Sequence, residues 1–288
     1  MNTTPQIHAF FDSVTNTVSY IVYDVASLEA AIIDSVADFD LPSGRISFES
    51  ANKLIAFVKK HGLEIKWILE THIHADHLTA APYLKEHLGG KIAIGANIQA
   101  GYTFWQPVFH LPEQPAIFDH LWHDNDEFQL GSTNCKVIAT PGHTAVDVSY
   151  LIGDALFVGD SIFMPDFGTA RCDFPGGSAR TLYQSIQRLF VLPDETRVYV
   201  GHDYLPNTRQ EFQWESSIKQ QKEQNVHVNT HTVEQEFVAI RGKRDQTLSV
   251  PRLIIPSLQF NLLGGRPQQS STNQQYFYWP INHPLFTS

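Results

Sequence analysis

The sequence predicts a mixed α/β fold in which helices pack on β-sheets, followed by a C-terminal extension. Residues 7–36 alternate between apolar and polar positions around turn signals, which is typical of a β-meander. Between residues 54 and 96, apolar stripes at helical spacing alternate with short apolar runs, which indicates helices layered on sheet. From about residue 208 the chain becomes more polar and is broken by proline. We therefore expect a catalytic core at residues 1–207 and an extension at 208–288 that packs on the core and helps to form the substrate pocket.

The expected elements follow from the spacing of apolar residues and from turn signals. Strands are expected at residues 7–11, 18–23, 30–36, 67–69, 91–96, 135–140, 148–152, 155–158 and 197–200. Helices are expected around residues 54–58, from near 78 to 88, and at 178–190, 209–224 and 234–245. Residues 102–123 are rich in aromatics, proline and histidine without periodicity, and they predict a long surface excursion. Ser178 is expected to cap the helix that follows it.

The composition is that of an acidic globular protein without disulfides. The 288 residues carry a formal net charge of -10 and include only 2 cysteines, Cys135 and Cys172. An acidic protein is a poor partner for nucleic acid or an anionic membrane, and two cysteines do not make a disulfide framework. No apolar run approaches the roughly 20 residues that span a bilayer, and the N-terminus lacks a signal-peptide pattern. We therefore expect a soluble cytoplasmic protein.

Three histidines and one aspartate follow directly after an apolar run that ends at Leu69. His72 and His74 alternate in an extended segment, so both side chains can turn to the same side. Asp76 and His77 follow where the chain turns toward the next helix. In a protein core each of these polar groups needs a partner, and a bound cation supplies that partner for all of them. The alternative is a set of histidines bonded to backbone carbonyls, but the spacing H-x-H-x-D-H favours a metal site.

Three later strands also end in a potential metal ligand, namely His143, Asp160 and His202. His143 stands in the sequence Pro-Gly-His-Thr, and the other two residues each follow a glycine. Ligands on the strand-end loops of a rigid sheet can converge on one point. Because the same event occurs four times along the chain, we expect these side chains to meet at one metal centre.

The complete pattern H-x-H-x-D-H, P-G-H-T, G-D and G-H resembles the metallo-β-lactamase superfamily. The resemblance implies an αββα sandwich whose metals lie at one edge between two sheets. It also implies two neighbouring metal sites, which Asp160 would bridge. The residues that match the first site are His72, His74 and His143, and those that match the second site are Asp76, His77 and His202.

The flanking sequence resembles one branch of that superfamily, the bacterial persulfide dioxygenases and the related β-lactamase-hydrolase-like proteins. The stretches that carry this resemblance are residues 164–177, 181–183, 236–241 and 251–259. The branch implies one Fe(II) per chain, held by His72, His143 and Asp160. The implied reaction converts glutathione persulfide, O2 and water to glutathione and sulfite. The four other matched residues would then orient the ligands or hydrogen-bond oxygen intermediates.

Two other functions stay open at this point. A dinuclear zinc hydrolase of glutathione thioesters, as in glyoxalase II, or of lactones would use all seven matched residues as ligands of two zinc ions. A non-enzymatic persulfide sensor could use the same fold as a scaffold, although a pure binding module has no use for an open metal site. Soluble proteins most commonly assemble as symmetric dimers, so a homodimer is possible.

Six residues are candidates for binding the glutathione moiety, namely Arg171, Asp173, Tyr183, Tyr204, Arg241 and Arg244. Arg171 is the first choice for a carboxylate clamp because its planar guanidinium suits that group, and a salt bridge with Asp173 is the alternative. The two tyrosines match, by resemblance, positions where glyoxalase II-like enzymes contact glutathione, with core packing as the alternative. The two arginines of the extension belong to a basic cluster that could equally be a solvated surface.

Overall fold

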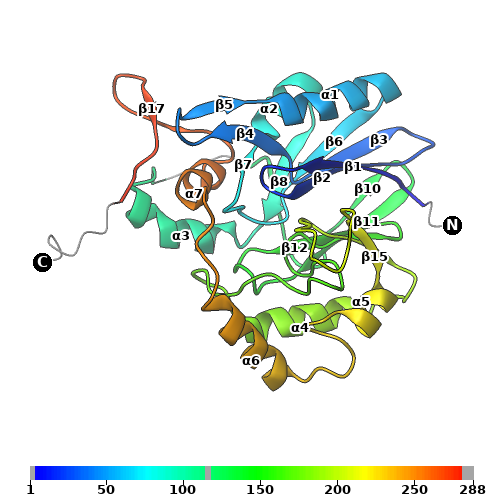
Figure 1. Ribbon diagram of the computed structural model, residues 1–288. Helices are drawn as coiled ribbons and strands as arrows, with labels where there is room; N and C mark the ends of the chain where they lie inside the picture. Colours follow the sequence, from blue (N-terminus) through cyan, green and yellow to red (C-terminus); the bar gives the residue numbers. More distant parts are fainter. Residues whose placement is uncertain (1–3, 114–117, 281–288) are drawn as a thin grey trace, which may run out of the picture.

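Two six-stranded sheets face each other and carry helices on their outer surfaces, as Figure 1 shows. The computed structural model describes residues 4–113 and 118–280. The predicted αββα arrangement is therefore confirmed. None of the helices in these described ranges is long and apolar enough to cross a membrane.

The first sheet places the cluster of histidines at its edge. Its strands, in spatial order, are β1 (Gln6–Asp12), β2 (Thr17–Tyr23), β3 (Glu29–Ile33), β6 (Glu64–Leu69), β8 (Lys91–Gly95) and β9 (His120–Trp122). The first three strands form the predicted antiparallel meander, and the last four run parallel. The helices α1 (Glu49–His61) and α2 (Ala81–Leu88) make the crossovers between parallel strands. Because parallel strands end at the same edge, the loop after β6 opens at that edge together with the loops after β3 and β8.

The second sheet supplies the other strand ends. Its strands, in spatial order, are β10 (Glu127–Leu130), β11 (Thr133–Ala139), β12 (Val148–Ile152), β13 (Ala155–Phe157), β14 (Arg197–Tyr199) and β15 (Glu215–Ser217). The crossover from β13 to the parallel strand β14 contains α4 (Ala179–Leu189). As predicted, the Ser178 side chain caps this helix, because it accepts a hydrogen bond from the Thr181 backbone amide.

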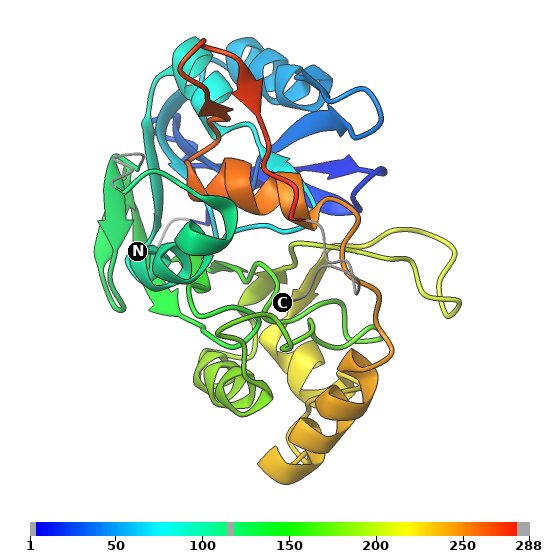
Figure 2. The same ribbon diagram turned by 90° about the vertical axis from the view of Figure 1, so that its left-hand side faces the viewer.

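The remaining elements border the two sheets. α5 (Ile218–Gln224) and α6 (Glu234–Asp245) lie beside α4 on the outer surface of the second sheet, as Figure 1 shows. Figures 1 and 2 show α3 (Ile98–Phe109) and α7 (Ile254–Leu262) at one edge of the sandwich, between the two outer layers of helices. The short strands β5 (Arg45–Ser47), β4 (Val36–Asp40) and β7 (Leu78–Thr79) form a small sheet, and β16 (Gln268–Gln269) pairs with β17 (Gln275–Tyr276).

Three apolar layers hold the sandwich together. Val18, Tyr20, Tyr150 and Phe157 belong to the cluster between the two sheets, and all are at most 2% exposed. A second cluster joins α1 and α2 to the first sheet, and a third joins α4 and α6 to the second sheet. Burial of these side chains stabilises the fold by about 1.5–3 kcal/mol each. The rigid core fixes the strand ends from which the site is built.

Two helix predictions were wrong at their boundaries. The helix expected near Leu78 begins only at Ala81, because Leu78 and Thr79 pair with β4 as the strand β7. The helix expected at residues 209–224 forms only from Ile218, because Glu215–Ser217 pairs with β14 and extends the second sheet. Strand pairing with a distant partner overrode the local helical pattern in both places.

The predicted excursion at residues 102–123 was also wrong in part. Its first half belongs to α3, whose buried side chains include Ile98, Tyr102 and Phe109. Pro107 inside the helix obscured this periodicity in the sequence. The part at residues 114–117 lies outside the described residues. The helix α7 was missed because its sequence combines an internal proline with buried polar residues.

Candidate metal centre

The structure brings all seven matched residues to one edge of the sandwich. The cluster from His72 to His77 follows β6, and His143 follows β11. Asp160 follows β13, and His202 follows β14. Five of the seven side chains come from residues that are at most 5% exposed, namely His72, His74, His77, His143 and His202. The sequence-based expectation that these strand ends converge is therefore matched by the geometry.

Three of these residues form a first group around Asp160. The Oδ2 atom of Asp160 lies 4.0 Å from Nε2 of His72 and 3.7 Å from Nε2 of His143. One potential ligand atom from each residue lies within 4.8 Å of the other two, so one cation could contact all three. This group is a set of two imidazoles and one carboxylate.

A second group lies directly beside the first. His74, Asp76 and His77 also place potential ligand atoms within 4.8 Å of one another. The Nε2 atom of His202 lies 3.5 Å from Asp76 Oδ2 and 3.5 Å from Asp160 Oδ1. Asp160 therefore lies between the two groups, with one oxygen toward each.

The hydrogen bonds on the other ring nitrogens fix the tautomers of three histidines. Nδ1 of His143 donates to the Arg171 carbonyl oxygen at 2.8 Å, and Nδ1 of His202 donates to the Asn16 carbonyl oxygen at 3.1 Å. The hydroxyl of Thr71 donates its proton to Asp34, so it accepts a 2.9 Å hydrogen bond from Nδ1 of His72. Each of these histidines consequently keeps a lone pair on Nε2, the atom that faces Asp160.

Three buried polar atoms at the centre have no hydrogen-bond partner among the described residues. They are Nδ1 of His74, Nε2 of His77 and Oδ1 of Asp160. Burying such atoms without a partner costs about 1–3 kcal/mol each, and native structures rarely leave them so. A cation bound between the two groups would satisfy all three. The donor set of imidazoles and carboxylates fits iron or zinc.

Two buried carboxylates hold His74 in place. Its Nε2 atom lies 3.1 Å from Asp34 Oδ1 and 3.3 Å from Glu70 Oε2. Burial lowers the pKa of His74, but the two carboxylates outweigh burial and raise that pKa well above its usual range. Burial and the neighbouring imidazoles lower the pKa of His72 well below its usual range. The pKa values of these two neighbouring imidazoles are therefore shifted in opposite directions. Neither carboxylate was recognised from the sequence, although each directly follows an apolar strand.

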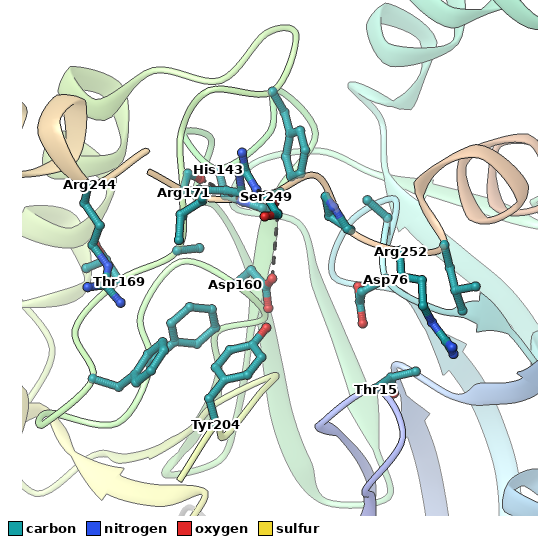
Figure 3. A pocket seen from close by; sticks show the side chains of 18 of the residues that line it. Thr15, Asp76, His143, Asp160, Thr169, Arg171, Tyr204, Arg244, Ser249 and Arg252 are labelled. Carbon is teal, nitrogen blue, oxygen red and sulfur yellow. Dashed lines mark hydrogen bonds and ion pairs between the residues drawn. The ribbon is translucent and has the colours of Figure 1, made fainter. Parts of the chain in front are cut away.

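A cavity of about 450 Å³ opens in front of Asp160 and His143. Figure 3 shows Arg244 and Arg252 on opposite sides of these two residues. Neither guanidinium has a carboxylate partner within the described part of the chain, although Arg244 lies 5.5 Å from the centre of the Phe167 ring. The cavity therefore combines a metal-binding floor with two unpaired cations. Arg252 was not singled out from the sequence as a residue of this cavity.

Comparison with known proteins identifies the fold family. Residues 13–202 match the family described as the metallo-beta-lactamase superfamily. The chain belongs to this superfamily. A beta-lactamase hydrolase-like protein from Xylella fastidiosa is 45% identical over 283 residues, which cover 97% of this chain. The chain spans 65% of the length of that relative.

The chain is also similar to two proteins named ETHE1, one of which is named a persulfide dioxygenase. The mitochondrial persulfide dioxygenase ETHE1 from Homo sapiens is 28% identical over 239 residues, which cover 82% of this chain and 80% of that protein. The crystal structure of ETHE1 from Myxococcus xanthus superposes with a TM-score of 0.73 at 30% identity, covering 91% of this chain and all of that chain. The superfamily fold is thus shown by sequence and by structure.

The structure places the six expected glutathione contacts in different surroundings. Tyr204 lines the cavity of this superfamily member, and its ring stacks on His202 at 5.5 Å between centroids. Tyr183 is not among the described residues that line this cavity, and its hydroxyl donates to the Thr232 carbonyl oxygen. Tyr204 is therefore positioned to contact a bound molecule, whereas Tyr183 connects α4 to the segment before α6.

Arg171 and Asp173 form a two-point ion pair at the rim of the cavity. Nε and Nη2 of Arg171 donate to the two carboxylate oxygens of Asp173 at 2.6 and 2.7 Å, and Nη1 donates to the Ser249 carbonyl oxygen. The guanidinium also lies 4.9 Å from the centre of the Phe174 ring. Because the Arg171 carbonyl oxygen accepts from His143, this pair connects the metal centre to the extension.

Arg241 also lines the cavity, although it is only 1% exposed. Its guanidinium donates to the Thr169 carbonyl oxygen and to Asp245, whose other oxygen accepts from the backbone amide of Cys172. Burial raises the pKa of the Cys172 thiol to about 12, so this cysteine stays protonated and is a poor nucleophile. Arg171 and Arg241 each form an ion pair with a carboxylate. Arg244, the third arginine considered from the sequence, forms no ion pair with a carboxylate of the described residues.

Proposed function

We propose that the protein is a cytoplasmic, iron-dependent persulfide dioxygenase with one Fe(II) per chain. Each turnover would consume glutathione persulfide, O2 and water and release glutathione, sulfite and two protons. The S–S bond of the persulfide breaks, its terminal sulfur is oxidised, and O2 is reduced. The inner sulfur leaves as the thiol of glutathione.

The observation that carries this proposal is the group formed by His72, His143 and Asp160. Two imidazoles and one carboxylate that face one point from one side are the ligand set of non-haem iron oxygenases. The cavity in front of His143 and Asp160 leaves room for substrates on the open side. When bound, iron would supply the electron transfer between sulfur and O2 that no side chain in the cavity provides.

The residues of the chain would orient the persulfide. Glutathione carries two carboxylates, and Arg244 and Arg252 place two unpaired cations on opposite sides of His143 and Asp160. Binding one carboxylate at each arginine would hold the peptide across the cavity with its sulfur toward the centre. Phe163, Phe167 and Phe174 line the same cavity and exclude water from part of it. The similarity to a protein named persulfide dioxygenase supports this substrate.

A specific observation favours a second candidate, a dinuclear zinc hydrolase. The unpartnered atoms on His74 and His77 belong to the second group, which a one-iron enzyme does not need as ligands. Two zinc ions in the two groups could activate a water molecule for attack on a thioester. The similarity to a protein named hydrolase-like supports this alternative.

The two candidates differ in whether they consume oxygen. Protein purified without oxygen and loaded with Fe(II) is mixed with glutathione persulfide, while O2 and sulfite are followed together. We expect equal amounts of O2 consumed and sulfite formed by the wild type, and loss of both in His143→Ala. The matched control is His123→Ala, an exposed histidine outside the site. Thioester hydrolysis without O2 uptake would overturn the proposal in favour of the hydrolase.

A further inference from the structure

A second, smaller cavity adjoins the metal-centre cavity on the side of α3 and α7. Its volume is about 40 Å³, and it shares Ala75 and Phe174 with the wall of the larger cavity. Ala75 stands between His74 and Asp76 in the chain, and the Phe174 ring lies 5.3 Å from the His143 ring. The small cavity is therefore separated from the second group of potential ligands by Ala75 and from His143 of the first group by Phe174.

The wall of this cavity is mostly apolar. It includes Ile73 from the loop at residues 70–77 between β6 and β7, which we call the metal loop. It also includes Val146 from the loop after β11, and Leu258 and Leu262 from α7. These side chains belong to a separate apolar cluster at this edge of the sandwich.

Two side chains of this wall carry a polar group, Thr144 and the indole of Trp105. The Thr144 hydroxyl is already used, because it donates to Asp147 at 2.6 Å and accepts from the Val146 amide. Water needs two to four polar partners to occupy a cavity, whereas apolar cavities stay dry and take up apolar gases.

We propose that this small cavity receives dioxygen and delivers it to the metal centre. The inference rests on the proposed dioxygenase function and assigns a separate site to the second substrate. Dioxygen is small, uncharged and apolar, so it partitions into a small cavity whose wall is mostly apolar. Glutathione persulfide is anionic and fits the larger cavity, where Arg244 and Arg252 lie. The two substrates then reach the same centre from different sides without competing for space.

Gly101 on α3 offers a way to fill the cavity without touching the metal centre. A methyl group at Gly101 would have Val146 Cγ1 as its nearest neighbour at 3.5 Å, which is an ordinary contact. Gly101→Ala therefore fits, and it also favours the helix. Because Gly101 lines the cavity, Gly101→Leu would extend a larger side chain into it. Ile254→Phe fills the same cavity from α7 if the leucine variant does not fold.

The test combines xenon binding with oxygen kinetics. Crystals under xenon pressure should show xenon in this cavity in the wild type and Gly101→Ala, and none in Gly101→Leu. In solution Gly101→Leu should raise KM for O2 several-fold, while kcat at saturating O2 and KM for the persulfide stay unchanged. A wild-type cavity without xenon, or an unchanged KM for O2 once the cavity is filled, would overturn the inference. Failure of the proposed dioxygenase function gives a different result, because the wild type itself would then consume no O2. In that case the assignment of dioxygen to this cavity would also be wrong.

Discussion

The side-chain amide of Asn261 donates a 2.8 Å hydrogen bond to the backbone carbonyl oxygen of His74. The same amide donates at 2.8 Å to the carbonyl oxygen of His77, and its oxygen accepts from the Thr79 amide at 2.9 Å. Asn261 lies on α7 in the extension, whereas the two carbonyl groups belong to the metal loop of the core and the Thr79 amide belongs to β7, which follows that loop. One buried side chain of the extension thus fixes the backbone that carries three of the potential ligands.

Replacing Asn261 should loosen the metal loop. Asn261→Leu leaves two buried carbonyl groups and one buried amide without a partner, so we expect the free energy of unfolding to fall by about 2–4 kcal/mol. Because the same loop carries the proposed iron ligand His72 two residues before His74, loss of these hydrogen bonds should lower iron affinity by roughly 10–100-fold. Competition with a chelator measures the affinity, and denaturant unfolding of the metal-free protein measures stability.

A matched control lies two residues away on the same helix. The Gln259 amide donates to the carbonyl oxygens of Ile255 and Tyr278, and its oxygen accepts from the Tyr278 amide. Gln259→Leu should therefore lower the free energy of unfolding while leaving iron affinity unchanged. An equal loss of affinity in both variants would show that α7 acts only through overall stability.

That the candidate ligands lie together could be predicted from sequence, because the signal is local. His72 to His77 form one continuous motif, and His143, Asp160 and His202 each directly follow an apolar strand. The αββα class followed from the same strand and helix alternation together with the family resemblance. These features depend on neighbours in the chain, and they are the features that the structure reproduces.

The partners of those ligands could not be predicted, because they come from distant parts of the chain. Asp34 contacts His74 across 40 positions, and Asn261 reaches the same residue across 187 positions. Arg252 stands in a stretch without periodicity, so nothing local distinguishes it from a surface arginine. The strand β15 was missed for the same reason, since it forms only by pairing with β14.

Stability should fall in acid partly through His227. Burial, followed by the charges of Arg241 and Arg244, lowers the pKa of His227 to about 4 from its ordinary value of 6.5. The ring is neutral in the fold, where Nδ1 accepts a 3.0 Å hydrogen bond from the Thr169 amide. Its contribution is therefore complete above pH 6.5 and is lost as the pH falls from 6.5 toward 4.

His227→Asn keeps an acceptor but removes the titrating group. Between pH 6.5 and 4 the wild type should lose about 2 kcal/mol more unfolding free energy than this variant, with solvent screening taken into account. Denaturant unfolding of both proteins at several pH values measures the difference. If the unfolding free energy of the two proteins changed equally with pH, His227 would not be the group responsible.

Loss of either unpaired arginine should weaken persulfide binding. Arg244→Gln and Arg252→Gln should each raise KM for glutathione persulfide by about threefold to tenfold, because each removes one exposed carboxylate contact. The kcat should change little, since the contact is present before and during the reaction. Steady-state O2 uptake at varied persulfide concentration measures both constants.

The control for this pair is Arg180→Gln, an exposed arginine on α4 that pairs with Glu234 outside the cavity. Its KM should equal that of the wild type. A persulfide of glutathione monoethyl ester, which lacks one carboxylate, should lose its dependence on one of the two cavity arginines only. Unchanged KM values in both arginine variants would rule out the orientation proposed for the peptide.

The metal content of protein purified without oxygen tests the central claim most directly. Elemental analysis is carried out on the wild type, Asp160→Asn and His77→Gln, and each sample is then tested for O2 uptake with glutathione persulfide. We expect about one iron per chain in the wild type and His77→Gln, with iron and O2 uptake lost in Asp160→Asn. About two zinc ions per chain without O2 uptake, with one of them lost in His77→Gln, would contradict the account and identify a dinuclear hydrolase.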